Sequence, residues 1–479
     1  LSTTDFAAFF REVHGHEPFI WQRDLLNQVV REGCWPKVID LPTGAGKTAC
    51  IDIGLFALAL TVGDGQPGWC ARRIVMVVDR RVVVDQAARR AHKIARALVQ
   101  PPSDSVTAEI SRRLASLSSE SVPLRVAVLR GGIPRDRGWA RTPDQPLVIA
   151  TTVDQLGSRL LFRGYGIRPG MRSVHAGLLG NDCLVLLDEV HLSRPFEQTL
   201  KAVSELRQTG YAASPLQVVA LSATPGGDEQ DTFRLSKKQR DEERLAIRLR
   251  ASKPATLHVC NGREALTGRT VECAISFLDG DHRSIAVVVN RVASAHAIAK
   301  ELREKLGAEP RADVQLLTGR MRPLDRDDIV RELEPRVAAI EERRKRNPDA
   351  RPVIVVATQC IEAGADFDFD AIVTEHASLD ALRQRFGRVD RLGEYGRAQA
   401  CVIAVQEDPE KKKWEIPKDD PIYGEALALT WKELKKPPKI PKKPRGSKHE
   451  VNDARLEPVV DFGVNELSKR LTPVSYTHL

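Results

Sequence analysis

The clearest chemistry in the sequence lies in residues 43–48, which read Thr-Gly-Ala-Gly-Lys-Thr between a short apolar stretch and an apolar helix-like run. Two glycines in such a segment let the backbone curl so that its N–H groups face phosphate oxygens, and the start of the following helix adds positive potential. Lys47 can neutralise a transferred phosphoryl group, and Thr48 can ligate Mg²⁺. The segment therefore predicts a site for a nucleoside triphosphate and its magnesium ion. Its residues are Thr43, Gly44, Ala45, Gly46, Lys47 and Thr48.

Two adjacent carboxylates, Asp188 and Glu189, follow the apolar run 184–187. A strand that ends in carboxylates places them at the edge where α/β sheets bind ligands. Asp188 is predicted to hold Mg²⁺ through water, and Glu189 to orient and deprotonate the attacking water. By itself such a pair is more often a solvated acidic turn, but here it follows the phosphate segment at the spacing of one lobe.

Three arginines, Arg385, Arg388 and Arg391, recur at i, i+3 spacing and are predicted to share one helix face. A salt-bridged surface helix is the usual explanation of such a stripe. However, charge on a transferred γ-phosphate needs a guanidinium delivered from outside the phosphate-binding lobe. Arg388 and Arg391 are the candidates for that role, with Arg391 as the direct finger.

The elements that must position these residues are strand-length apolar runs, each followed by a helix-like stretch. In the first half they lie at 37–39, 74–78, 124–129, 147–150, 183–187 and 218–221, and in the second half at 285–289, 314–317, 353–357, 371–374 and 401–405. Continuous apolar strands that alternate with helices indicate parallel sheets covered on both faces. The predicted fold class is α/β, with two tandem lobes, each a mostly parallel sheet covered by helices, and a short C-terminal extension.

The predicted organisation is a first ATP-binding lobe over residues 1–226, a charged linker over 227–255, a second lobe over 256–405 and an extension over 406–479. The linker shows no strand pattern, and residues 332–346 form a charged helix on the second lobe. Residues 435–445 indicate a flexible connector. The last seven residues look foreign to the chain, so we expect the native protein to continue beyond them.

Composition adds little to this assignment. The net charge of +9 and the pI near 9.1 are compatible with a polyanionic partner. The eight cysteines form no CxxC pair, which favours reduced thiols in a cytoplasmic protein. No apolar run approaches the roughly 20 residues of a membrane-spanning helix, so no membrane association is expected.

Taken in order, these segments resemble the DExH helicases of superfamily 2, across residues 18–405. Leucine at position 41, where the strict phosphate-loop pattern has glycine, is typical of helicases. Residues 79–86, 129–132, 188–192 and 384–391 look more narrowly like the CRISPR-associated helicase of type I systems, in the subtype formerly called I-U. The resemblance implies two RecA-like lobes and an ATP-driven motor that moves 3′ to 5′ on single-stranded DNA.

The resemblance also implies roles for further residues. Gln22 would read the adenine of ATP, with Phe19 or Trp21 stacked on the base, and Gly364 and Asp366 would lie near the nucleotide. Coupling of hydrolysis to movement is implied for His191, Ser222, Thr224 and Gln384. Nucleic-acid contacts are implied for Arg80, Arg81, Thr151, Thr152, Asn290, Arg291, Thr318, Arg320 and Thr358, although each of these could equally be an ordinary loop residue.

The family's partners are R-loop DNA, an RNA-guided surveillance complex and a metal-dependent HD nuclease. None of the eleven histidines is followed by aspartate, so we expect no nuclease activity from these residues and a nuclease domain or chain elsewhere. Two alternatives stay open. One is an RNA helicase or the motor subunit of a restriction system, and the other is a nucleic-acid-binding module that no longer hydrolyses ATP.

Overall fold

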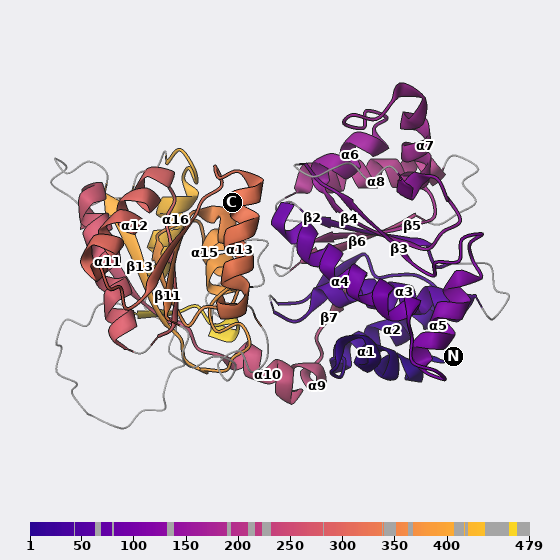
Figure 1. Cartoon of the computed structure of the whole chain (residues 1–479), viewed down its shortest axis with the longest axis horizontal. Coiled ribbons are helices and arrows are strands. Elements are labelled where there is room, and N and C mark those ends of the chain that lie inside the picture. Colours follow the sequence, from indigo (N-terminus) through magenta and orange to yellow (C-terminus); the bar gives the residue numbers. More distant parts are fainter. Residues whose placement is uncertain are drawn as a thin grey trace, which may run out of the picture. The chain divides into compact units, whose positions relative to one another are not determined.

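The computed structural model describes the chain in ranges separated by short gaps (Figure 1). These are residues 1–42, 44–62, 69–78, 81–131, 138–188, 193–208, 216–222, 231–280, 282–337, 339, 351–362, 367–406, 416, 420–435 and 459–466, with only the backbone described at 81–83, 208, 222 and 323. The chain forms two compact units, Leu1–Leu245 and Ala246–Leu479. No helix among the described residues is both long and apolar enough to cross a membrane.

The first unit is built on a seven-stranded parallel sheet in the order β3-β4-β2-β5-β6-β1-β7. Its strands are β1 (Val38–Asp40), β2 (Arg73–Val78), β3 (Arg125–Leu129), β4 (Leu147–Thr152), β5 (Cys183–Asp188), β6 (Leu216–Ser222) and β7 (Thr232–Arg234). Every residue of β2 and β4 is buried, as expected for strands covered on both faces.

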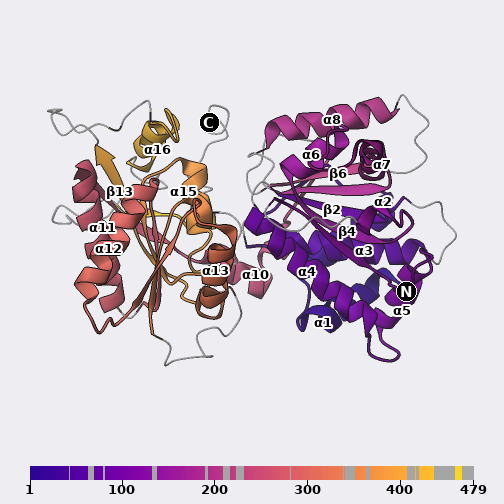
Figure 2. The ribbon, with the colours of Figure 1, turned by 45° about the horizontal axis from the view of Figure 1, so that its top comes forward.

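Helices cover both faces of this sheet (Figures 1 and 2). On one face lie α1 (Phe6–His14), α2 (Ile20–Glu32), α3 (Cys50–Thr61), α4 (Arg81–Val99) and α5 (Val106–Ala115), and on the other α6 (Val153–Leu160), α7 (Pro169–Gly180) and α8 (Arg194–Gln208). Helix α3 is buried from Cys50 through Leu60, so it is a core helix, which accounts for its apolar sequence. The short helices α9 (Lys237–Arg240) and α10 (Glu243–Arg250) follow β7.

The second unit repeats this plan with the sheet order β10-β11-β9-β12-β13-β8-β14, in which only β14 runs antiparallel to its neighbour. Its strands are β8 (Pro254–Asn261), β9 (Ser284–Val288), β10 (Asp313–Leu317), β11 (Val353–Ala357), β12 (Ala371–Glu375), β13 (Gln399–Gln406) and β14 (Val459–Asp461). Its helices are α11 (Gly262–Asp279), α12 (Val292–Leu306), α13 (Pro323–Val337), α15 (Leu379–Phe386) and α16 (Ala426–Leu434). Helices α11 and α12 cover one face, and α13 and α15 the other (Figure 2).

The predicted fold class is confirmed, and all eleven predicted strands are present. Three strands were missed. In the linker, predicted to have no strand, Thr232–Arg234 forms β7 and pairs with β1, because a single buried residue, Phe233, gives too short an apolar signal. Strand β8 was missed because buried and accessible residues nearly alternate along it. Strand β14 and helix α16 show that part of the predicted extension packs into the second unit.

Candidate active site

The ends of three neighbouring strands bring the predicted nucleotide residues of the first unit together. Asp40, the last residue of β1, is paired with Ser222, the last of β6, and Leu221 is paired with Asp188, the last of β5. The phosphate loop leaves β1 at this edge, so it begins two strands away from the Asp188 carboxylate. This is the edge of a parallel sheet at which α/β proteins bind nucleotides.

The loop itself has the conformation that its glycines were predicted to allow. Gly44 and Gly46 have φ of +85° and +84°, in the left-handed region that glycine adopts without strain. The loop is held from α2, since Trp21 Nε1 donates to the Ala45 carbonyl oxygen at 3.0 Å. Lys47 then opens a short 3-10 turn that continues into α3.

The charges of Lys47 and Asp188 both influence the thiol at the start of α3. Burial raises the pKa of Cys50, the first residue of α3, and the charge of Asp188 raises it further while that of Lys47 lowers it. Thr48, the predicted metal ligand of the loop, is partly accessible. Carboxylate and hydroxyl oxygens suit Mg²⁺, so this donor set fits the ion.

The adenine-reading segment is tightly packed against the loop. Gln22 is 2% exposed, its Oε1 accepts a hydrogen bond from Phe19 N at 2.9 Å, and its Nε2 lies 3.2 Å from the position of a Cβ on Gly46. Trp21 has no accessible surface and Phe19 is 5% exposed, and stacking of either ring on a base stays a prediction. The guanidinium of Arg244 already lies 5.1 Å from the Phe19 ring centre.

A buried ion cluster behind the loop was missed by sequence reasoning. Asp52 in α3 accepts hydrogen bonds from His14 Nε2 at 2.6 Å and from Arg90 Nε at 2.5 Å. Burial alone would raise the pKa of Asp52, but Arg90 and His14 together hold it below its usual range. Burial also lowers the pKa of His14. The cluster ties α3 to α1 and α4, and the lone carboxylate inside the apolar run 51–60 was its signal.

In the second unit, Arg385 is a buried structural residue. It has no accessible surface, and its guanidinium forms an ion pair with Glu362 at 2.8 Å. The same group donates to Thr374 Oγ1 and to Asn290 Oδ1, each at 2.8 Å, and to Tyr423 OH at 3.0 Å. It therefore links the ends of β9 and β12 to the segment before α16.

The prediction that the three arginines share one helix face is wrong. Helix α15 ends at Phe386, with Gly387 as its C-cap, so Arg388 and Arg391 lie in the turn that follows. Both are partly accessible, and Arg388 Nη2 donates to the Glu362 carbonyl oxygen at 3.1 Å. Their roles as phosphate-contacting groups stay predictions, whereas Arg385 is distinguished from them by its burial.

Sequence reasoning also missed Lys253, which lies beneath this turn. Its Nζ donates to the Phe386 carbonyl oxygen at 2.9 Å, and the side chain is buried. Burial lowers the pKa of Lys253 to about 8, although Asp390 and Asp368 oppose the shift. No local pattern could have shown it, because the groups around it come from residues more than a hundred positions away.

Most of the residues predicted to contact nucleic acid lie at the carboxyl ends of strands, but several are already engaged. Asn290 Nδ2 donates to the His376 carbonyl oxygen at 2.8 Å, in addition to its bond with Arg385. Thr151 is fully buried and donates to the Leu129 carbonyl oxygen at 3.0 Å. The side chains of Asn290 and Thr151 therefore stabilise the carboxyl edges of their sheets. Thr152, Thr318 and Thr358 are also buried, whereas Arg291 is partly accessible and Arg320 is exposed.

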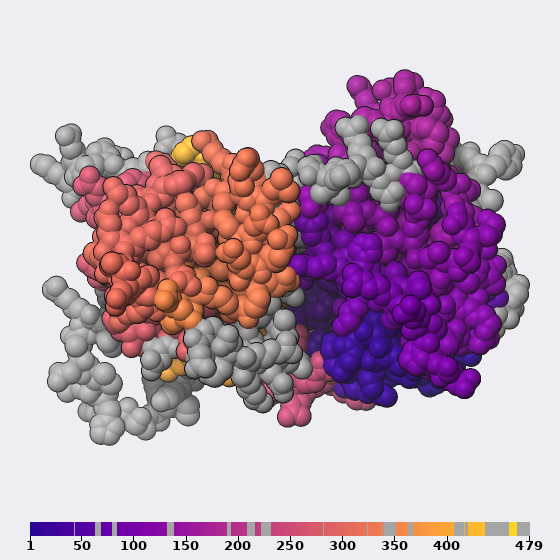
Figure 3. Space-filling model, viewed as in Figure 1, coloured from indigo at the N-terminus to yellow at the C-terminus, as the bar shows by residue number. Residues whose placement is uncertain are grey.

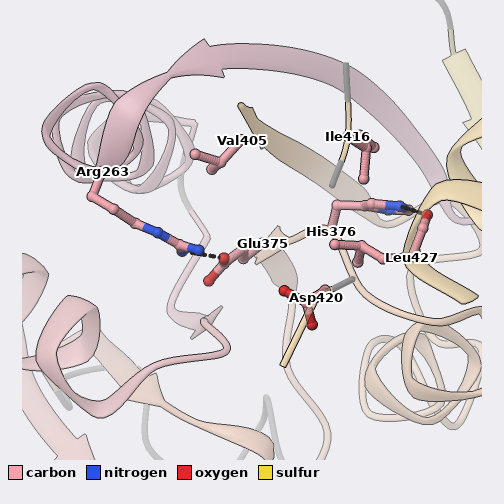
Figure 4. Close-up of a pocket in the computed structure, with 7 residues that line it drawn as sticks. All are labelled: Arg263, Glu375, His376, Val405, Ile416, Asp420 and Leu427. Atoms are coloured by element: carbon pink, nitrogen blue, oxygen red, sulfur yellow. Dashed lines mark hydrogen bonds and ion pairs between the residues drawn. The ribbon is translucent and has the colours of Figure 1, made fainter. Parts of the chain in front are cut away.

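The C-terminal segment closes the same edge of the second sheet. Figure 4 shows a small pocket there, in which Arg263 points at Glu375 and the His376 ring points at the Leu427 carbonyl. The Arg263–Glu375 distance is 2.5 Å and the His376–Leu427 distance is 2.8 Å. The pocket is lined by Arg263, Glu375, His376, Val405, Ile416, Asp420 and Leu427. Since these polar groups mostly face one another, we assign the pocket a structural role.

Several predicted residues lie outside the part of the chain that the structure describes. They are Thr43, Arg80, Glu189, His191, Thr224, Gly364 and Asp366. Only the backbone is described for Arg81, at the start of α4, and for Ser222, at the end of β6. Gln384 lies in α15 and is partly accessible.

Comparison with known families agrees with this geometry. Residues 21–233 match the DEAD/DEAH box helicase family, and residues 281–394 match the C-terminal part of the CRISPR-associated nuclease/helicase Cas3. The chain carries a DEAD/DEAH box helicase domain followed by a Cas3-like C-terminal domain. The resemblance read from the sequence, to helicases and more narrowly to the CRISPR-associated helicase, is thereby confirmed.

Relatives of this helicase include two curated Cas3 proteins. One, from Methanothermobacter thermautotrophicus, is 34% identical over 113 residues, which is 24% of this chain and 12% of the relative. The other, from Thermoproteus tenax, is 27% identical over 271 residues, which is 54% of this chain and 41% of the relative. The matched part thus spans less than half of either relative.

Solved structures share the fold of this helicase at low identity. The T. fusca Cas3–ATP structure aligns with a TM-score of 0.60 at 17% identity, covering 91% of this chain and 53% of the other. The DUF1998 helicase MrfA bound to DNA and AMPPNP aligns with a TM-score of 0.55 at 15% identity, covering 84% of this chain and 50% of the other.

Proposed function

We propose that this chain is an ATP-dependent translocase that moves 3′ to 5′ on single-stranded DNA in type I CRISPR interference, after an RNA-guided surveillance complex has opened an R-loop. The observation that carries the ATP-driven part is the pairing of strand ends that brings the phosphate loop and Asp188 to one edge. The DNA substrate and the defence role are supported by the Cas3-like domain and the curated Cas3 relatives.

In this proposal each group has a separate task. The loop amides and Lys47 bind the β- and γ-phosphates, while Thr48 and Asp188 hold a magnesium ion that offsets their charge. Glu189 takes the proton of the attacking water. Arg388 and Arg391 supply the guanidinium groups that offset the charge on the γ-phosphate during its transfer, with Arg391 as the direct contact.

The proposal is tested by ATP turnover of the purified chain with single-stranded DNA, with single-stranded RNA and without polymer. We expect DNA to stimulate turnover. Lys47→Ala and Glu189→Gln should each abolish it, and Glu189→Gln should still bind ATP. Lys201→Ala is the matched control, since its side chain lies 61% exposed on α8.

An RNA helicase is the alternative function, favoured by the likeness of the fold to the DEAD-box helicase Mss116 bound to ssRNA, with a TM-score of 0.53 and 83% of this chain covered. Stimulation by RNA and not by DNA would establish it and overturn the DNA assignment. Polarity is read separately, from displacement of streptavidin placed at the 3′ or the 5′ end of a DNA strand; displacement at the 3′ end alone would contradict 3′ to 5′ movement.

A further inference from the structure

The connection between α6 and α7 exposes an unusual group of side chains. Five large apolar residues lie here, with exposed fractions given in parentheses: Leu161 (57%), Phe162 (60%), Tyr165 (58%), Met171 (38%) and Val174 (40%). Arg163, Arg168 and Arg172 are exposed beside them. No aspartate or glutamate occurs between Asp154 and Asp182. We call residues 161–174 the arginine–aromatic surface.

The backbone holds Phe162 outward at an energetic cost. Its φ is +58°, in the left-handed region that non-glycine residues seldom adopt. Hydrogen bonds fix this conformation, since Phe162 N donates to the Arg159 carbonyl oxygen at 3.1 Å and Arg163 N to that of Ser158 at 2.7 Å. Gly164 lies so close to Ile167 that an added Cβ would be 2.5 Å from its Cδ1. Strain of this kind tends to be retained at functional positions.

The surface lies away from the carboxyl ends of the strands. Helix α6 starts at Val153, directly after Thr152 at the end of β4, and packs over β4 and β2. It ends at Leu160, whose Cδ2 lies 4.0 Å from the position of a Cβ on Gly180, three residues before β5 begins. Figures 1 and 3 show the α6–α7 region projecting from the body of the first unit.

The residue types on this surface indicate the kind of ligand that it binds. Aromatic residues and methionine occur at protein interfaces too, but exposed arginines in a stretch of sequence without Asp or Glu favour a polyanion. Exposed aromatic rings beside guanidinium groups suit a polyanion with unstacked bases. We propose that the arginine–aromatic surface binds single-stranded nucleic acid as a further contact, apart from the strand ends, an inference that rests on the proposed function.

The test compares the affinity for a fluorescein-labelled single-stranded DNA, measured by anisotropy over a range of salt concentrations. Loss of a base stack costs about 1–3 kcal/mol, so Phe162→Ala/Tyr165→Ala should bind about 5- to 150-fold more weakly. Replacing Arg163, Arg168 and Arg172 by glutamine should reduce the salt slope by about 2. The controls are Leu324→Ala, 78% exposed, and Arg31→Gln, 73% exposed.

The outcomes separate this inference from the proposed function. If the variants bind DNA within twofold of the wild-type affinity, the surface does not bind nucleic acid. If they keep that affinity but lose binding to an RNA-guided complex, the surface is a protein interface, and the inference is likewise overturned. If the unaltered chain hydrolyses no ATP but the variants still lose affinity, the translocase proposal fails and the surface stands. Basal ATP turnover and melting temperature should be unchanged in every variant.

A second site is indicated by an independent cluster inside the second unit. His258 on β8, Cys273 on α11 and Cys401 on β13 are all buried, and their ligand atoms lie within 4.8 Å of one another. Arg269 Nη2 donates to His258 Nδ1 at 2.9 Å. Hydrogen bonds from Cys401 and His258, opposed by burial, lower the pKa of Cys273.

Two thiolates and an imidazole form the donor set of a soft metal ion. Two thiolates would neutralise Zn²⁺, which lowers the penalty for burying the ion. Zn–S bonds of about 2.3 Å require the ligand atoms to approach only slightly closer than they lie here. We propose that His258, Cys273 and Cys401 bind Zn²⁺, with Cys260 on the same face of β8 as the fourth donor. Arg269, whose side chain is 40% exposed, would have to release His258.

The test measures zinc content after dialysis and the thiolate-to-metal absorption of the Co²⁺-loaded chain. We expect about one ion per chain, lost in Cys273→Ser and in Cys401→Ser and retained in the exposed control Cys34→Ser. Arg269→Gln should bind the ion more tightly, because it removes a competing cation. Absence of metal from both wild type and Arg269→Gln would overturn the site, as would a Cys273–Cys401 disulfide in chains purified without oxidant.

Discussion

Replacing Arg385 by methionine should destabilise the second unit strongly, although the change affects no predicted catalytic group. The substitution leaves the Glu362 carboxylate, 4% exposed, without its ion-pair partner at 2.8 Å. Breaking a buried pair by removing one member costs about 3–5 kcal/mol. Asn290 and Thr374 lose donors as well, so the upper half of this range is expected.

The corresponding shift is large enough to measure by calorimetry. For a unit of this size, 1 kcal/mol corresponds to about 2–4 °C, so a loss of about 4–5 kcal/mol should lower the second-unit transition by about 8–20 °C. Adding Glu362→Gln to Arg385→Met should restore about 1–4 kcal/mol, because the uncompensated charge is then gone. The first-unit transition serves as the internal control.

Arg388→Gln and Arg391→Gln provide the matched comparison. Both residues are partly accessible, so each change should shift the melting temperature by less than about 3 °C. Under the proposed function, each should nevertheless reduce polymer-stimulated ATP turnover by about a thousandfold. If Arg385→Met melts within 2 °C of wild type, or melts no earlier than the other two variants, the structural role argued for Arg385 is wrong.

Three further predictions concern pH and the nucleotide site. Burial lowers the pKa of His376 to about 4, so between pH 7 and pH 5 this imidazole takes up a proton in the unfolded chain but not in the folded one. The free energy of unfolding of the second unit should therefore fall by about 2 kcal/mol over this range. Parallel curves of stability against pH for wild type and His376→Gln would contradict this. Gly46→Ala should weaken binding of an ATP analogue about tenfold or more. Gly15→Ala should leave this affinity unchanged, since Gly15 has a similar φ of +82° but a Cβ added there would meet no atom within 4 Å. Equal affinities of the two variants in a calorimetric titration would refute the argument that the loop needs Gly46. Asp52→Asn should lower the stability of the first unit by up to about 3 kcal/mol, because Arg90, whose side chain is 22% exposed, loses its charged partner. An unchanged first-unit transition would show that the cluster is not needed.

The sequence predicted the strands and the phosphate loop because their signals are local. An apolar run followed by Gly44, Gly46 and Lys47 specifies a strand, a left-handed turn and a helix start without help from distant residues. The same holds for Asp188, whose place at a strand end depends on the preceding apolar residues.

The arginine stripe was misjudged because spacing alone does not report where a helix ends or what is buried. Gly387 stops α15, a terminating signal that the i, i+3 pattern ignored. The partners of Arg385 come from positions 290, 362, 374 and 423, so its burial follows only from the tertiary arrangement. Strand β14 was missed for the same reason, since only its pairing with β8 defines it.

The antiparallel strand β14 fastens the late part of the chain to the beginning of the second unit. Asp461 accepts hydrogen bonds from Ser252 Oγ at 2.6 Å and from Lys253 N at 2.7 Å. The next residue, Phe462, stacks on Phe386, and the two ring centres lie 4.0 Å apart. Phe386 stands two positions before Arg388 in the chain. Lys253 adds a second link, since its carbonyl oxygen accepts a hydrogen bond from Phe462 N at 3.0 Å and its Nζ donates to the Phe386 carbonyl oxygen at 2.9 Å. Tension on the residues that follow β14 would therefore reach the arginine turn through the ring stack and Lys253, without crossing the sheet. We expect mechanical load on that tail to be felt at the turn before the rest of the unit yields.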